Sequence, residues 1–192
     1  MPPERARSVE VHPLTPERWP DLETLLGPNG AYGGCWCMFF RMRRKDFAKS
    51  TGPANKAAME QIVGSGHPPG LLVYLAGEVA GWVSLDRREN YPHVEHSRKL
   101  ARLDDRPVWS IVCFVVGKQF RRQGLMTEMI RGAEQYARQQ GAESLEAYPT
   151  EPEAELKGDE GYHGITTAFR KAGFEEVRRV SEKQVVMRKE LT

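Results

Sequence analysis

The stretch from Val108 to Thr127 constrains the fold of this chain more than any other. It begins with a run of β-branched and aromatic residues, Val108 to Val116, which is typical of a strand buried on both faces. Gly117 ends the run, and a basic loop follows from Lys118 to Gly124. Apolar residues then recur at helical spacing from Leu125 to Ala137. The stretch therefore predicts a buried strand, a glycine-containing basic loop and an amphipathic helix, in that order.

The junction of this loop with the helix is suited to a polyphosphate. The first turn of a helix leaves backbone amides unpaired and carries the positive end of the helix dipole. Arg121 and Arg122 add positive charge immediately before it. Gly124 has no side chain, so the backbone at this point can approach a phosphate group closely.

Three segments carry a resemblance to a known family. The loop Arg121-Arg122-Gln123-Gly124-Leu125-Met126 resembles the Arg/Gln-x-x-Gly-x-Gly/Ala loop of the GNAT superfamily of acyl-CoA-dependent N-acetyltransferases, with Met126 standing where that family prefers Gly or Ala. The segment from Gly81 to Leu85 is similar to the third GNAT strand, and that from Phe169 to Phe174 to the end of the closing helix. The order of elements from residue 9 to 188 also resembles the GNAT layout.

The resemblance implies a mixed α and β fold of the α+β kind. Its centre is a twisted, mostly antiparallel sheet of about six to seven strands, with a splay between strands 4 and 5 and helices on both faces. The strands expected from the residue pattern are 9–14, 71–76, 79–85, 108–116, 144–149, 175–180 and 184–188, and the helices are 16–26, 56–63, 125–137 and 162–174. The segment 90–107 is either a lid on the substrate side or a solvated loop with a helical turn at 97–103.

Length and charge restrict the classes of protein. The 192 residues fit a single GNAT domain over 9–192, preceded by a disordered segment over 1–8. With 28 Lys and Arg against 26 Asp and Glu, the net charge is only +2, so nucleic acid is not expected as the main partner. The chain starts without an apolar signal segment and has no membrane-length apolar run, so we expect a cytoplasmic protein with no membrane partner.

The resemblance implies acetyl-CoA as cosubstrate, with no metal. The backbone of Phe114, Val115 and Val116 would bind the pantetheine arm in the manner of an added strand. The pyrophosphate would lie against the loop and the first helical turn, at Arg121, Arg122, Gln123, Gly124, Leu125, Met126 and Thr127. Phe169 would also contact the cofactor, since it stands where many members have a tyrosine that protonates the departing thiolate.

An amine acceptor has to lose a proton before it can attack. An alkyl ammonium with a pKa near 10.4 pays about 4–5 kcal/mol to become neutral at pH 7, so a base or a desolvating pocket must offset that. The glutamate that some members carry in the fourth strand falls on Ser110, which can hold a relay water. Glu146 is the nearest carboxylate and shares a strand face with Tyr148. The catalytic candidates are therefore Glu146, Tyr148 and Ser110, with Glu146 either serving as the base or pointing to solvent.

The acceptor side is expected near an unusual segment of glycines, aromatics and thiols. By analogy with the family, Trp36, Met38 and Phe39 are candidate substrate contacts, and Asp86 could attract a cationic amine. Cys35 and Cys37 could be metal ligands with His93 and His96, but their spacing is not that of a zinc site, and buried thiols are the preferred interpretation.

The sequence therefore predicts transfer of an acetyl group from acetyl-CoA to a primary amine of a small molecule or peptide. A non-catalytic acyl-CoA-binding module is one alternative, because Ser110 and Phe169 stand where catalytic groups are often found. An acyltransferase using an aminoacyl-tRNA donor is another, suggested by the basic residues 41–45 and 121–122. The acceptor and the oligomeric state, with a homodimer as one option, are left open.

Overall fold

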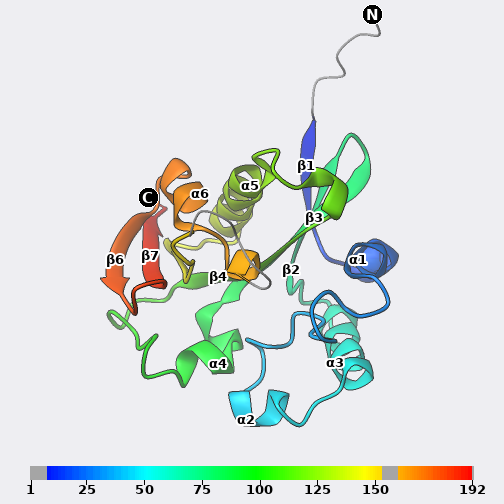
Figure 1. Cartoon of the computed structure of the whole chain (residues 1–192), viewed down its shortest axis with the longest axis horizontal. Helices are drawn as coiled ribbons and strands as arrows, with labels where there is room; N and C mark the ends of the chain where they lie inside the picture. The colour runs from blue at the N-terminus through cyan, green and yellow to red at the C-terminus, as the bar shows by residue number, and fades with distance from the viewer. Residues whose placement is uncertain (1–7, 153–159, 192) are drawn as a thin grey trace, which may run out of the picture.

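The computed structural model describes residues 8–152 and 160–191 (Figure 1). Its centre is a seven-stranded sheet of order β1-β2-β3-β4-β5-β7-β6. The strands are β1 (Val9–Pro13), β2 (Gly70–Leu75), β3 (Glu78–Arg87), β4 (Trp109–Val116), β5 (Ser144–Ala147), β6 (Glu175–Arg179) and β7 (Val185–Glu190). Within this sheet β4 and β5 run parallel and the other neighbours are antiparallel. The predicted fold class is confirmed. The disorder predicted for 1–8 lies, apart from Ser8, outside the described residues.

Helices cover both faces of the sheet. One face carries α5 (Leu125–Gln139) and α6 (Thr166–Lys171), and the other carries α1 (Trp19–Leu26) and α3 (Gly52–Gly64), as Figure 1 shows. The shorter elements are α2 (Arg44–Phe47), α4 (Pro92–Glu95) and the 3-10 turns η1 (Pro16–Arg18), η2 (Arg88–Asn90), η3 (Lys118–Phe120) and η4 (Glu160–His163). No helix in the described part of the chain is long and apolar enough to span a membrane.

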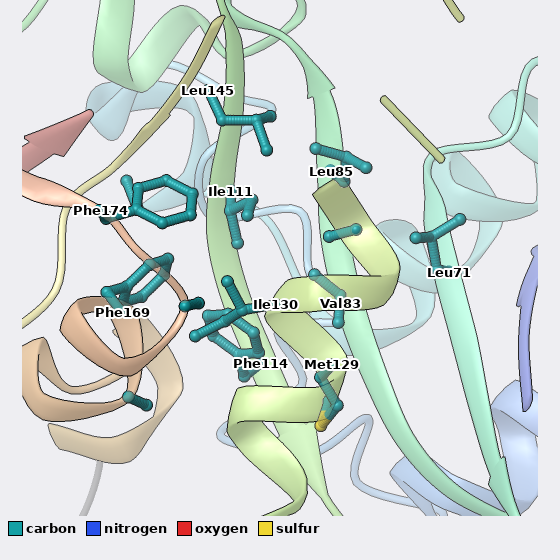
Figure 2. Close-up of a cluster of buried hydrophobic side chains, with 14 of the residues drawn as sticks. Leu71, Val83, Leu85, Ile111, Phe114, Met129, Ile130, Leu145, Phe169 and Phe174 are labelled. Atoms are coloured by element: carbon teal, nitrogen blue, oxygen red, sulfur yellow. The ribbon is translucent and has the colours of Figure 1, made fainter. Parts of the chain in front are cut away.

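The largest core cluster lies between α5 and the sheet (Figure 2). The predicted apolar period of α5 is confirmed, since Leu125, Met129, Ile130, Ala133 and Ala137 are all buried. They pack with inward residues of the strands, and with Phe169 and Phe174 from the C-terminal part of the chain. A helix carrying one apolar stripe has to cover a sheet face in this way, because the stripe cannot be left in water.

The β2–β3 hairpin differs slightly from its prediction. Its turn is Ala76-Gly77, with φ of +52° and +83°, one residue earlier than expected. Two left-handed residues in a row suit the right-handed twist of the strands they join. β3 also continues to Arg87, two residues beyond the predicted end, which carries Asp86 into the sheet.

The segment between β3 and β4 is a packed part of the domain. Tyr91 and Val94 are fully buried and Leu100 is 6% exposed, in one cluster with Phe40 and Tyr148. The alternative of a solvated loop is therefore wrong. The helical turn expected at 97–103 is also wrong, because the helix of this segment is α4, which Pro92 begins.

The closing helix begins later than predicted. Residues 160–163 form η4, and α6 starts only at Thr166. Gly164 separates the two with a φ of +78°, and a Cβ built there would lie 2.9 Å from the Phe114 ring and 2.7 Å from the Phe169 ring. The glycine thus permits a close approach of this segment to β4.

Candidate active site

The two parallel strands of the sheet stay together for only three residue pairs. Trp109 pairs with Leu145, Ser110 with Glu146 and Ile111 with Ala147, and no further pair between β4 and β5 follows. A bulge in β4 comes directly after this point, since Ser84 pairs with Cys113 while Leu85 pairs with Ile111. The extra residue bends β4 away from β5. The predicted splay between strands 4 and 5 is confirmed, and it begins at Ile111.

Beyond the splay, β4 has a strand partner on one side only. Residues 113–116 pair with β3, and on the side of β5 the described residues provide no strand for them. The segment carrying Phe114, Val115 and Val116 therefore presents a strand edge of the kind that an extended ligand can join. Gly164 and α6 lie beside this edge, through the contacts of Phe114 with Gly164 and Phe169.

The basic loop and α5 meet as the sequence predicts. Arg122 has a φ of +61° and Gly124 one of +76°, so the chain turns twice through the left-handed region before α5 begins. For Arg122 this conformation costs about 1–2 kcal/mol, which is strain of the kind found at functional sites. Arg121 donates from Nε to the Val116 carbonyl at 3.1 Å, which fixes the loop to the end of β4. A Cβ built on Gly124 meets no atom within 4 Å.

The loop residues differ in exposure in a way that suits ligand binding. Arg121, Arg122, Gln123 and Gly124 are exposed, whereas Leu125 is buried and Met126 and Thr127 are half-buried. Leu125 thus anchors the first turn of α5 in the core, at the end of the helix where the first amides lack an intrahelical partner. The arrangement combines two arginines, a helix N-terminus and open space, which favours a polyphosphate.

A buried charged cluster lies where β4 and β5 are still paired. Glu146 is 1% exposed, and its Oε2 accepts hydrogen bonds from Arg88 at 2.9 Å and from the Tyr148 hydroxyl at 3.2 Å. Its Oε1 accepts from Arg188 at 2.7 Å. Ser110 is fully buried and lies 2.9 Å from the Tyr148 hydroxyl. The structure therefore brings together all three predicted catalytic residues, and the alternative that Glu146 points to solvent is wrong.

The environment of this cluster restricts its chemistry. Two arginines hold the Glu146 carboxylate, so protonating it would weaken two charge-assisted hydrogen bonds. Burial, and after it the charge of Glu146, raises the pKa of Tyr148 well above its ordinary value. The tyrosine is thus a weak acid, better suited to donating a hydrogen bond than to losing its proton.

Asp86 is held in a second buried cluster. Its side chain is 1% exposed and accepts hydrogen bonds from Arg41 at 2.9 Å, from Asn90 at 2.8 Å and from its own chain at Arg87. His67 Nε2 lies 2.8 Å away. Burial alone would raise the pKa of Asp86, but the charge of Arg41 and the other hydrogen bonds outweigh it and lower that pKa. The carboxylate predicted to attract a substrate cation is thus already paired.

Aromatic side chains cover the face of the sheet that carries α1 and α3, near the splay. Trp36 and Met38 are buried, and Trp36 stacks on Trp19 with ring centres 6.0 Å apart. Phe39 and Phe40 pack against the ring of His93, at 4.4 Å and 5.4 Å. His93 Nδ1 is buried without a hydrogen-bond partner among the described residues. Burial, and then the electrostatic influence of Arg44 and His163, lowers the pKa of His93, so its imidazole stays neutral at pH 7.

The cysteines are free thiols. Cys37 is buried, and burial raises the pKa of Cys35 to about 11, with a further contribution from the charge of Cys37. Across residues 8–152 and 160–191, no three metal-ligating side chains gather in one place.

The fold and this site define a class before any comparison does. One parallel strand pair that splays beside a basic loop and a helix N-terminus is the architecture expected of the acetyltransferase fold that the sequence resembles. The family model for GNAT acetyltransferases matches residues 36–156, and the chain belongs to this family.

Solved structures show the same fold at low sequence identity. An acetyltransferase of the GNAT family from Listeria monocytogenes is similar with a TM-score of 0.58 and 15% identity, over 95% of each chain. An N-acetyltransferase from Staphylococcus aureus is similar with a TM-score of 0.55 and 10% identity, over 96% of this chain and 99% of that one. No curated protein sequence matches the chain.

Sequence reasoning missed the arginines that pair with the two carboxylates. Arg188 carried a usable signal, because it continues the apolar run Val185–Met187 and a charge in a buried strand needs a partner. Arg88 and Arg41 lie in irregular segments, and nothing in their surroundings in the sequence distinguishes them from solvated arginines.

Proposed function

We propose that this protein transfers the acetyl group of acetyl-CoA to a primary amine of a small molecule or peptide by direct attack. The observation that carries the proposal is the unpaired β4 edge at residues 113–116 leading into the strained loop at the N-terminus of α5. An extended pantetheine arm fits the first feature and a pyrophosphate fits the second. Family membership supports the reaction class.

The proposed cosubstrate contacts follow from this geometry. The backbone of Phe114, Val115 and Val116 would pair with the amides of the pantetheine arm. The pyrophosphate would accept from the amides of the loop and first turn, at Arg122, Gln123, Gly124, Leu125, Met126 and Thr127, with Arg121 adding charge. Phe169 is fully buried against Phe114, so its contribution would be to shape the floor of the pantetheine channel.

In the proposed reaction the neutral amine nitrogen attacks the thioester carbonyl carbon. A tetrahedral intermediate forms, the carbon–sulfur bond breaks, and CoA leaves as a thiolate. Near pKa 8.5 this thiolate needs little help to depart, and the Tyr148 hydroxyl would stabilise it by turning its one proton from Glu146 to the sulfur. Ser110 would hold that hydroxyl in position, since the two oxygens lie 2.9 Å apart.

Two residues are candidates for the proton acceptor. Glu146 is one, but its pairing with Arg88 and Arg188 favours a positioning role. His93 is the other, and its neutral imidazole with an unpartnered Nδ1 on the acceptor side favours it. Removing a general base typically costs 10²–10⁴ in rate, so His93→Gln is expected to lower the rate about a hundredfold. The measurement is CoA thiol release across pH 5–9, in which the wild-type rate should fall as the histidine is protonated.

Cofactor binding is tested by calorimetric titration with acetyl-CoA and CoA. Gly124→Trp is expected to abolish binding because an indole would occupy the space in front of the loop. Gly141→Trp is the matched control, since Gly141 also has a positive φ and open space at its Cβ but lies at the opposite end of α5. Binding that survives Gly124→Trp would rule out the proposed pyrophosphate site.

A non-catalytic acyl-CoA-binding module is the second candidate. The pairing of Glu146 and Asp86 favours it, because neither carboxylate is available as a base in this arrangement. Cofactor binding without thiol release across a broad amine panel would support this module over the transferase.

A further inference from the structure

A basic hollow lies on the acceptor side, apart from the proposed cofactor channel. It has a volume of about 640 Å³ and lies between α2, the chain leading into α3 and the ends of α4. Its lining includes the basic residues Arg41, Arg43 and Lys49, together with His96, Ser50 and Thr51. None of these residues belongs to the cofactor loop.

The charges of the hollow are not balanced by the protein. Arg41 is neutralised by Asp86 at 2.9 Å. Arg43 and Lys49 form no ion pair with a carboxylate in the part of the chain that the structure describes, and both are exposed to solvent. Asp46 is the carboxylate of the lining, so Arg43, Lys49 and Asp46 together carry one net positive charge. Such a site favours an anion.

His96 orients Arg43. His96 Nδ1 lies 2.9 Å from the Pro92 carbonyl oxygen, which can only accept, so Nδ1 carries a proton. In this tautomer Nε2 is an acceptor, and Arg43 donates to it at 2.5 Å. The Arg43 guanidinium is therefore held at the hollow, and its remaining N–H groups can bind an oxyanion.

The hollow is one aromatic layer away from the splay. Pro92 and His96 line it, and between them His93 packs on Phe40. Phe40 in turn belongs to the cluster that contains Tyr148 and Val112, where β4 leaves β5. The hollow therefore lies on the outer side of the packed layer whose inner side borders the splay.

We infer that this hollow binds an oxyanion carried by the acceptor, a carboxylate or a phosphate, and so selects amines with an anionic tail. The inference rests on the proposed acetyl transfer and adds the substrate class. Arg43 precedes α2 and Lys49 follows it, and both line the hollow, so the two side chains can contact the same anion. An amine without an anionic tail would make none of these contacts.

The test compares acceptors that each contain five carbon atoms. The probes are 5-aminopentanoate, 5-aminopentyl phosphate and pentylamine, with kcat/KM measured by CoA thiol release. We expect at least one anionic probe to exceed pentylamine about tenfold, and the better of the two identifies the oxyanion. The variant Arg43→Gln with Lys49→Gln should reduce the preference to within about twofold and leave pentylamine unchanged. Lys45→Gln, an exposed change on α2 outside the lining, should keep the preference.

A second experiment distinguishes a failure of this inference from a failure of the proposed function. Pentanoate and pentyl phosphate carry no amine, and their binding can be titrated calorimetrically without turnover. If the double variant weakens this binding about tenfold, the hollow is supported as an anion site. This holds even if no amine is acetylated, a result that would contradict only the proposed acetyl transfer. Turnover of pentylamine at or above the anionic probes, or a preference that survives the double variant, overturns the inference and leaves the acetyl transfer intact.

Discussion

Replacing Glu146 by glutamine should destabilise the protein strongly, because the carboxylate is buried between two arginines. Glutamine keeps the shape but replaces one acceptor oxygen with an NH2 group, which would then face either Arg188 or the pair of Arg88 and Tyr148. Breaking a buried ion pair from one side costs about 3–5 kcal/mol. Arg88 keeps Glu95 at 2.6 Å and Arg188 keeps Asp104, so we expect the lower end, about 3 kcal/mol.

The assay is urea unfolding followed by tryptophan fluorescence, together with a thermal scan. For a chain of this size, a loss of about 3 kcal/mol lowers the midpoint temperature by about 6–12 °C. Glu128→Gln is the matched control. Glu128 pairs with Arg131 at 2.8 Å on the exposed face of α5, and its loss should change the unfolding free energy by less than about 0.5 kcal/mol.

Activity measured in parallel separates a positioning residue from a base. If Glu146 only positions its neighbours, Glu146→Gln should lose stability. Its rate of acetyl transfer should then recover in part at a lower temperature, where more of the variant is folded. An unchanged unfolding midpoint with a rate lowered a hundredfold or more would refute this reasoning and make Glu146 the proton acceptor. An unchanged midpoint and an unchanged rate would show that the cluster contributes neither stability nor chemistry.

Three further perturbations test other parts of the structure. Gly70→Ala should cost about 3 kcal/mol in urea unfolding, because its Cβ would lie 2.2 Å from the Val83 carbonyl oxygen, whereas Gly64→Ala in open space on α3 should be neutral or stabilising. Burial lowers the pKa of His93, so the neutral imidazole contributes its full stability above the unfolded pKa near 6.5, and that contribution is lost as the pH falls below it. The unfolding free energy of His93→Gln should therefore depend less on pH between 6.5 and 5 than that of the wild type. Cys35, with a pKa raised to about 11, should react with iodoacetamide at pH 8 much more slowly in the folded protein than in urea, and equal rates would contradict the raised pKa.

The local sequence predicted most of the elements, for a physical reason that particular residues illustrate. The period of Leu125, Met129, Ile130, Ala133 and Ala137 predicts α5, because a helix repeats every 3.6 residues whatever surrounds it. The run Val108 to Val116 predicts β4 because β-branched and aromatic side chains suit a pleated, buried surface. The prediction of a helical turn at 97–103 was wrong, since the helix of that segment is α4, and α6 begins later than predicted, after Gly164.

The sequence by itself determined the family architecture and the placement of the basic loop at the start of α5. These follow from short-range sterics and from the order of elements along the chain. Only the tertiary structure decided that the carboxylates of Glu146 and Asp86 are buried and paired with arginines. Glu146 meets Arg88 from 58 positions away and Arg188 from 42, and Asp86 meets Arg41 from 45. Whether a charge is buried and paired depends on such distant contacts, because the free energy of an ionised group is set by what replaces its water.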